Sequence, residues 1–271
     1  MSTGRFLRLS RIFDQDSKRS IIVPMDHAVD GYFPELAEPV SLIASLADVR
    51  PNAFLLRRGT AELFSRCFAG KAALIVRVTC ATGLRGKVIE QSYTLSVEEA
   101  VRIGADAVSP IVFVGSDTEP QDLHNLGILT DKCREWGMPL MGEILPVGNA
   151  EATPFQGPYT AEDLRAAVRV AGEEGCDFVK THYTGDPASF SEVTGYSTVP
   201  VVVAGGPKAD TLEETLRMVD GALRGGAKGV ALGRKVWASP NPPATLKALR
   251  QIIHEGKNVE NVIAELKGIK S

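Results

Sequence analysis

Short apolar runs bounded by turn residues recur along the 271 residues of the chain. Val, Ile and Leu dominate these runs, and several runs show no alternation of apolar and polar positions. Continuous apolar runs of this length are typical of parallel strands that are covered on both faces. The pattern predicts strands at Ile21–Met25, Ala53–Leu56, Leu74–Val78, Ala107–Val112, Pro139–Ile144, Phe178–His182, Val199–Val203 and Gly229–Leu232.

Helical patterns separate these strands. Apolar residues spaced by three and four predict helices over Val97–Ile103, Ala161–Glu174 and Leu212–Leu223. Glycines such as Gly104 and Gly175 stand between a helix and the next strand, where a positive φ turns the chain back.

The repeating strand and helix define the expected fold. We predict an α/β protein with one domain over residues 1–271, a single (β/α)₈ TIM barrel. It has a short N-terminal cap over about 1–18 and a C-terminal helix over about 258–271. A doubly wound open sheet is the alternative, but no G-x-G-x-x-G motif follows the first strand.

Composition narrows the class of protein. The chain has 30 Lys and Arg against 33 Asp and Glu, a net charge of −3. That balance gives no overall attraction to nucleic acid or to an anionic membrane, and no run approaches the roughly 18 apolar residues of a membrane span. The four cysteines are widely spaced and form no C-x-x-C pair, which argues against a zinc ribbon or a disulfide framework. We therefore expect a cytoplasmic protein with neither nucleic acid nor membrane as partner.

Lys180 is the most informative candidate residue. It lies in an apolar strand, although lysine is rarely buried unless another group pairs with it. An amine in a low-dielectric barrel mouth loses its proton more easily and can then form a Schiff base with a ketone. The alternative is a structural lysine that reaches solvent or pairs with Asp26 or Glu143.

Two glycine turns indicate a phosphate site. Gly205-Gly206 and Gly233-Arg234 follow the last two predicted strands, where TIM barrels commonly bind phosphate. Glycine lets backbone N–H groups approach phosphate oxygens, and Lys208 and Arg234 add positive charge. Alternatively, these glycines only form tight turns.

Four further side chains at strand ends are candidates for proton transfer. Asp26 ends the first strand and either moves protons or forms a structural ion pair. Glu143 is a candidate acid or base, and His182 points the same way as Lys180 if the strand alternates strictly. His27 is a weaker candidate, because a lone histidine near a loop is more often a scaffold residue.

Several motifs match a known family. They are Val23–His27, Lys180-Thr181 with Tyr183–Asp186, Ala204–Lys208 and Gly229–Arg234. With them the chain resembles the DhnA-type class I aldolases, which include archaeal-type fructose-bisphosphate aldolases and 2-amino-3,7-dideoxy-threo-hept-6-ulosonate synthases. The likeness runs from about Arg5 to about Gly256, and K-T-x-Y-T-G-D is its most specific part.

The resemblance implies a TIM barrel in which Lys180 forms the Schiff base and Asp26 assists proton transfer. It also implies that the Gly205–Gly206 and Gly233–Arg234 turns hold the substrate phosphate. Members of the family need no metal and no cofactor, and they are usually homo-oligomers.

One departure from the family pattern matters. Leu145 stands where the aldolases of this family carry an acid–base tyrosine, and a leucine cannot carry a proton. Either the reaction differs, or the proton is carried by Glu143, His27, His182, Asp26 or Tyr183. The family also contains a thiolase of autoinducer-2 breakdown, which lacks the tyrosine too.

The sequence therefore favours a lyase or transferase of carbohydrate metabolism. It would make or break a C–C bond in a small phosphorylated ketone through a Schiff base at Lys180. A thiolase or transaldolase-like transfer, or a catalytically silent phosphosugar-binding relative, are the alternatives. Arg57 and Arg58 either contact the substrate or only pair at the surface.

Overall fold

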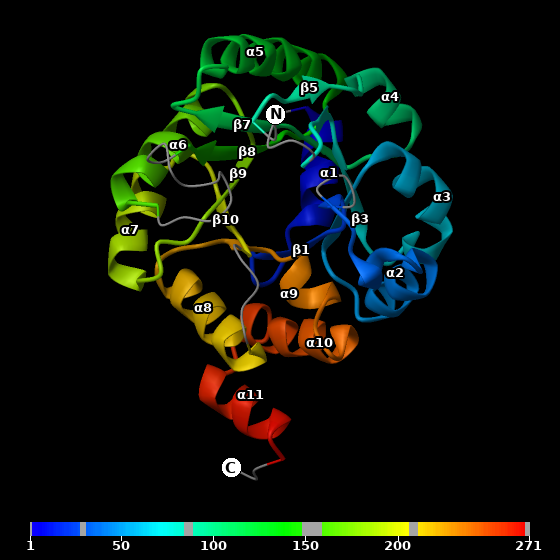
Figure 1. Ribbon diagram of the computed structural model, residues 1–271, viewed down its shortest axis with the longest axis vertical. Coiled ribbons are helices and arrows are strands. Elements are labelled where there is room, and N and C mark those ends of the chain that lie inside the picture. The colour runs from blue at the N-terminus through cyan, green and yellow to red at the C-terminus, as the bar shows by residue number, and fades with distance from the viewer. Residues whose placement is uncertain (1, 28–30, 84–88, 148–158, 206–210, 269–271) are drawn as a thin grey trace.

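The computed structural model describes residues 2–27, 31–83, 89–147, 159–205 and 211–268. Within these residues, nine parallel strands form one sheet that curls into a nearly closed barrel (Figure 1). The strands are β1 (Ser20–Pro24), β2 (Ala53–Leu56), β3 (Ala73–Arg77), β6 (Ala107–Ser109), β7 (Ile111–Val114), β8 (Met141–Pro146), β9 (Phe178–Thr181), β10 (Val201–Ala204) and β11 (Gly229–Ala231). The short strands β4 (Thr79–Cys80) and β5 (Ser92–Tyr93) form a separate antiparallel pair.

The barrel closes between β6 and β7, the two halves of its fourth strand. The neighbours run β6-β3-β2-β1-β11-β10-β9-β8-β7, so the two end strands are consecutive in the chain and only Pro110 separates them. Proline has no N–H to donate, but the Pro110 carbonyl accepts from the Glu143 N–H at 3.1 Å. A parallel bridge between Val108 and Leu140 closes the ring. β6 and β7 cover the predicted strand Ala107–Val112 and extend to Val114. The predicted TIM barrel is confirmed.

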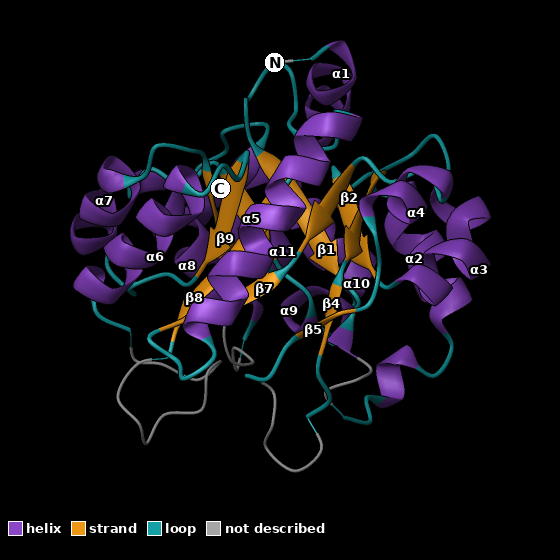
Figure 2. Cartoon of the chain, turned by 90° about the horizontal axis from the view of Figure 1, so that it is seen from above, coloured by secondary structure: helices purple, strands orange, loops and turns teal. Residues whose placement is uncertain are grey.

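Helices surround the barrel (Figure 2). They are α1 (Thr3–Ile12), α2 (Pro39–Asp48), α3 (Arg58–Phe68), α4 (Val97–Arg102), α5 (Glu119–Trp136), α6 (Ala161–Glu173), α7 (Pro187–Tyr196), α8 (Leu212–Arg224), α9 (Arg234–Trp237), α10 (Pro242–Ile253) and α11 (Val259–Leu266), with a 3₁₀ turn at Pro34–Leu36. Among the described helices, none has the length and apolar character that crossing a bilayer requires.

Local sequence sets the ends of these helices. Thr160 and Thr211 begin α6 and α8 with capping boxes, in which side chain and backbone satisfy each other's hydrogen bonds. Gly104, Gly175 and Gly226 have φ values of +79°, +87° and +95° and turn the chain from a helix into the next strand.

Alternation along the strands divides the core into two parts. One set of strand side chains packs outward against the helices. The other set fills the interior of the barrel and includes Ile22, Leu55, Met141 and Phe178. These apolar side chains fill the part of the barrel near the amino ends of the strands. The inward positions nearer the carboxyl ends therefore remain for polar groups.

Helix α1 covers the amino ends of the strands. Ile12 is fully buried, and the Phe13 ring meets the Phe178 ring edge-on at 5.2 Å. Arg5 pairs with Asp177 at 2.6 Å, just before β9 begins. In Figure 1, α1 lies within the ring of strands, whereas α11 projects beyond it. The end opposite α1 is the one where the strands finish.

Candidate active site

A buried lysine–glutamate pair stands on neighbouring strands. Lys180 of β9 lies in register with Glu143 of β8, and its Nζ donates to Glu143 Oε1 at 2.6 Å. Lys180 is only 6% exposed, so the lysine is paired inside the barrel and does not reach solvent. Both side chains project inward because they lie two residues beyond the interior residues Phe178 and Met141.

Arg77 extends this pair into a four-membered cluster. It is the last residue of β3, and its Nη2 donates to Glu143 Oε2. Its Nε donates to Asp26 Oδ2 at 2.8 Å, and its Nη1 donates to Ser109 Oγ at 3.0 Å. Two cations and two carboxylates therefore alternate in the order Lys180, Glu143, Arg77, Asp26, with no net charge.

The pairing overcomes the cost of burial. Burial alone raises the pKa of Asp26, but the positive charges of Arg77 and Lys180 hold that pKa far below its usual range. Burial likewise raises the pKa of Glu143, and Arg77 and Lys180 bring it below its ordinary value. Both carboxylates are therefore ionised at neutral pH and form ion pairs with the cations beside them.

Two histidines adjoin the cluster as neutral bases. Burial lowers the pKa of His27 and of His182 to about 4 in each case. His27 Nδ1 lies 3.6 Å from Asp26 Oδ1, and its ring meets the Trp237 ring at 5.6 Å. His182 stacks on Tyr159, with the ring centroids 4.3 Å apart and the planes 9° from parallel.

Two of the predicted residues lie away from this cluster. The Tyr183 ring packs against Phe190 of α7 at 5.1 Å. A Cβ atom on Gly221 of α8 would lie 2.6 Å from Tyr183 Oη, so the phenol faces the outer helices. Strand alternation explains this placement, because Tyr183 is three residues from Lys180 and points the opposite way. Arg58 is exposed on the first turn of α3.

Arg57 has a defined backbone role. Its Nε donates to the Asp26 carbonyl and its Nη1 donates to the Thr79 carbonyl, both at 3.1 Å. The guanidinium therefore ties together the chain segments that follow β1 and β3.

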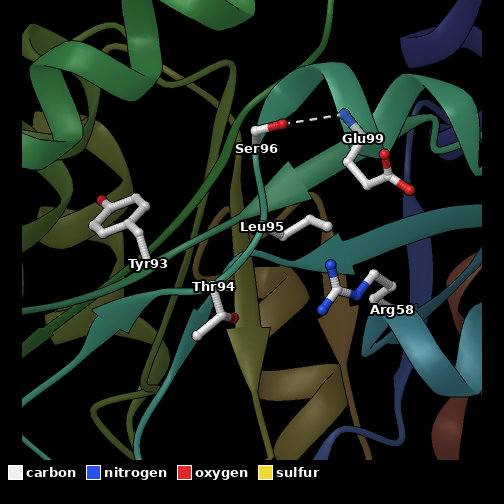
Figure 3. A pocket seen from close by; sticks show the side chains of 6 residues that line it. All are labelled: Arg58, Tyr93, Thr94, Leu95, Ser96 and Glu99. Carbon is white, nitrogen blue, oxygen red and sulfur yellow. Dashed lines mark hydrogen bonds between the residues drawn. The ribbon is translucent and has the colours of Figure 1, made fainter.

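Arg58 borders a side pocket of about 530 Å³ instead (Figure 3). The pocket lies by the first turns of α3 and α4, and Ser96 Oγ on its rim accepts from the Glu99 N–H at 3.2 Å. None of the four cluster residues lines it. Its lining consists of Arg58, Tyr93, Thr94, Leu95, Ser96 and Glu99.

The predicted phosphate turns lie partly in the described chain. Gly205 follows β10, and Gly233 precedes α9, whose first residue is Arg234. A Cβ on Gly233 would lie 2.7 Å from the Pro24 carbonyl oxygen and from His27 Cε1, so this close approach requires glycine. Gly206 and Lys208 lie outside the described residues.

Sequence reasoning missed Arg77 and Tyr159. Arg77 ends a strand whose five residues are all buried, and arginine is almost never buried without a partner. That rule, which singled out Lys180, would have found Arg77 as well. Tyr159 gave no comparable signal, because it lies outside any strand and acts through a ring contact with His182. Among the described residues, no three His, Cys, Asp or Glu side chains are grouped as a metal site would require.

Comparison with known proteins identifies the family. A family model described as DeoC/LacD family aldolase matches residues 20–239, most of the chain and nearly all of the barrel. The chain belongs to this aldolase family. The predicted resemblance to class I aldolases is thereby confirmed.

Three relatives of this aldolase family member are informative. A 2-amino-4,5-dihydroxy-6-oxo-7-(phosphonooxy)heptanoate synthase of Streptomyces griseus is 36% identical, over 93% of this chain and 90% of the relative. A 2-amino-3,7-dideoxy-D-threo-hept-6-ulosonate synthase of Archaeoglobus fulgidus is 34% identical, over 96% and 95%. An archaeal fructose-1,6-bisphosphate aldolase, solved with its catalytic Lys covalently bound to a carbinolamine intermediate, superposes with a TM-score of 0.82. It is 29% identical, over 92% of this chain and 99% of that one.

Proposed function

We propose that the protein is a class I aldolase-type enzyme that makes or breaks a C–C bond beside the ketone of a small phosphorylated substrate. Lys180 forms the Schiff base. The observation that carries this proposal is the buried Lys180–Glu143 pair, which sits on the inner wall of an aldolase-family barrel. The covalent lysine intermediate of the structurally similar archaeal aldolase supports the same chemistry.

Glu143 is the group that handles the proton of the lysine. An ammonium must lose a proton before its nitrogen can attack a ketone, and Glu143 Oε1 is 2.6 Å from Nζ. The attack forms a carbinolamine. The proton taken up by Glu143 then returns to the carbinolamine hydroxyl, which leaves as water. The iminium that results withdraws electrons from the adjacent C–C bond.

Arg77 and the glycine turns support this step by positioning. Arg77 holds both carboxylates, so Glu143 faces Lys180 in one geometry. We propose that the Gly205–Gly206 and Gly233–Arg234 turns hold the substrate phosphate, with Lys208 adding charge. Phosphate binding there would fix the ketone against Lys180, since binding energy from a remote group can be used for orientation.

Leu145 supports a second candidate function. It is fully buried and lies two residues beyond Glu143 on β8, so it faces inward without any group that carries a proton. A phosphosugar-binding relative that forms the Schiff base but completes no reaction fits this observation. A thiolase or transaldolase-like transfer fits the same Schiff-base step, and dependence of product formation on coenzyme A separates the thiolase from the aldolase.

Borohydride trapping tests the proposal. The chain is incubated with dihydroxyacetone phosphate or fructose 1,6-bisphosphate, reduced, digested and mapped by mass spectrometry. We expect one adduct, on Lys180, and none in Lys180→Met. Lys132→Met, which removes an exposed lysine of α5, should trap as the unaltered chain does. An adduct that persists in Lys180→Met, or no adduct with either ketone, would contradict the Schiff-base assignment.

The cellular setting stays a prediction. The four cysteines are free, which supports a reducing cytoplasm. Assembly as a homo-oligomer and independence of any cofactor are proposals that rest on the family resemblance alone.

A further inference from the structure

We infer that His182 is the acid–base residue of the C–C bond step, with Nε2 exchanging a proton with the substrate hydroxyl that becomes, or derives from, the aldehyde. This inference deepens the proposed function and rests on the Schiff base at Lys180. It assigns a role that Leu145 cannot fill and that the ion-paired carboxylates are poorly suited to fill.

The position of His182 carries the inference. It lies two residues beyond Lys180, and the outward contact of Tyr183 with Phe190 shows that the alternation of β9 continues past the end of the strand. His182 and Lys180 therefore share the inner face, about 7 Å apart along the chain. Glu143 and Lys180 also act electrostatically on the His182 imidazole, which agrees with this placement.

The unsatisfied nitrogen of His182 is the second observation. His182 is 6% exposed, and its Nε2 is buried without a hydrogen-bond partner among the described residues. A buried polar atom without a partner costs roughly 1–3 kcal/mol, and it is rare in folded proteins. A substrate hydroxyl at this point would satisfy Nε2. Stacking on Tyr159 meanwhile fixes the plane of the ring.

The other candidates are engaged elsewhere. Glu143 accepts from Lys180 and Arg77, and Asp26 accepts from Arg77, so the carboxylate oxygens are already engaged inside the cluster. His27 Nδ1 is also without a hydrogen bond, but it is directed at the Asp26 carboxylate, and its ring packs edge-on against Trp237. His182 is a neutral imidazole on the strand that carries the lysine.

The neighbouring strand adds a structural reason. Thr181 Oγ1 donates to the Ile144 carbonyl at 3.1 Å, which keeps β8 and β9 side by side past their last register pair. Leu145 and His182 thus occupy adjacent positions at the same height in the barrel. An imidazole beside the leucine supplies the proton carrier that the leucine lacks.

One proton moves between His182 and the substrate in each direction of the reaction. In cleavage, Nε2 removes the proton from the hydroxyl on the carbon at the far end of the breaking bond, β to the iminium carbon. The O–H electron pair forms the aldehyde C=O, and the C–C pair moves to form an enamine as the iminium nitrogen accepts electrons. The His182 imidazolium then gives its proton to the enamine carbon, and hydrolysis of the resulting iminium regenerates Lys180. In synthesis His182 takes a proton from the carbon beside the iminium to form the enamine, and it returns that proton to the new alkoxide before the iminium is hydrolysed.

The test compares trapping with bond cleavage in the full chain. The probes are dihydroxyacetone phosphate for borohydride trapping, and fructose 1,6-bisphosphate and fructose 1-phosphate for cleavage. In His182→Gln we expect unchanged trapping at Lys180 and a fall in the kcat of cleavage by about 10²-fold or more. Adding imidazole to His182→Ala should restore part of kcat, which a purely structural role would not allow. His124→Gln, at an exposed histidine of α5, is the matched control.

Each other outcome is decisive. Normal cleavage by His182→Gln, or loss of cleavage only in His27→Gln, overturns the role of His182 and leaves the Schiff base intact. Trapping without cleavage of either ketose by the unaltered chain also overturns it and favours the silent binder. Absence of any Lys180 adduct in the unaltered chain refutes the proposed function itself.

Discussion

The buried ion pairs make Arg77 the residue on which the cluster depends. It contacts both Asp26 and Glu143, and its side chain is 1% exposed. Without it, two ionised carboxylates would remain inside the barrel with Lys180 as the only described cation bonded to either of them. Breaking a buried pair in this way is costly because it leaves an uncompensated buried charge.

Arg77→Met should therefore lower the free energy of unfolding by about 3–5 kcal/mol. Urea denaturation followed by circular dichroism measures it. Arg102→Met is the matched control, because Arg102 forms an exposed pair with Glu99 within α4, and its loss should change stability by less than about 0.5 kcal/mol. Equal effects of the two substitutions on the free energy of unfolding would show that burial of the Arg77 ion pairs contributes nothing to stability.

Much of the site was predictable from residue chemistry. Lys180, Glu143, Asp26, His27 and His182 were selected because polar groups end apolar strands, and the structure brings them together. The outward direction of Tyr183 cannot be predicted from the motif, because a motif shows which residues are present but not which way they point. The sequence cannot show whether Arg57 contacts the substrate, because a guanidinium donates to a backbone carbonyl as readily as to a ligand.

At the scale of elements, the first strand of the chain, β1, pairs with the last, β11. We call this pairing the seam, because it joins the two ends of the barrel sequence. Ser20 pairs with Gly229, whose φ of +136° is a conformation that L side chains rarely adopt. A Cβ at position 229 would lie 2.0 Å from the Ser20 carbonyl oxygen. Strand and helix patterns predicted both strands, but not this contact, because pairing between distant segments leaves no local pattern.

Gly229→Ala should destabilise the protein by at least about 1–3 kcal/mol, through backbone strain and displacement of β1. Thermal unfolding of the variant measures the effect. Gly59→Ala is the counterpart, since Gly59 lies in the first turn of α3 with open space around its Cα, and it should be neutral or mildly stabilising. A Gly229→Ala protein as stable as Gly59→Ala would mean that the seam tolerates a side chain.

At the scale of the whole molecule, buried neutral histidines couple stability to pH. His27 and His182 bind protons only near pH 4 when folded, whereas their ordinary value is 6.5. The unfolded chain therefore binds more protons between these values, and stability is lost as the pH falls from about 6.5 to about 4. Burial also lowers the pKa of His254, which acts in the same direction.

Urea midpoints measured from pH 7 to pH 4 should decline steadily and recover on return to pH 7. His182→Gln should make the decline shallower, because one of the contributing groups is gone. His124→Gln, at an exposed histidine of α5, is the matched control. A midpoint that stays constant across this range would show that the buried histidines titrate normally.

The seam between β1 and β11 also constrains how the protein is made. As a ribosome releases the chain, β1 meets β2 early, but its other edge has no partner until the segment around Gly229 emerges. Open strand edges invite pairing with other chains, and partly folded barrels expose such edges. That edge of β1 therefore stays open for most of the synthesis of the chain, and it is closed only when β11 pairs with it.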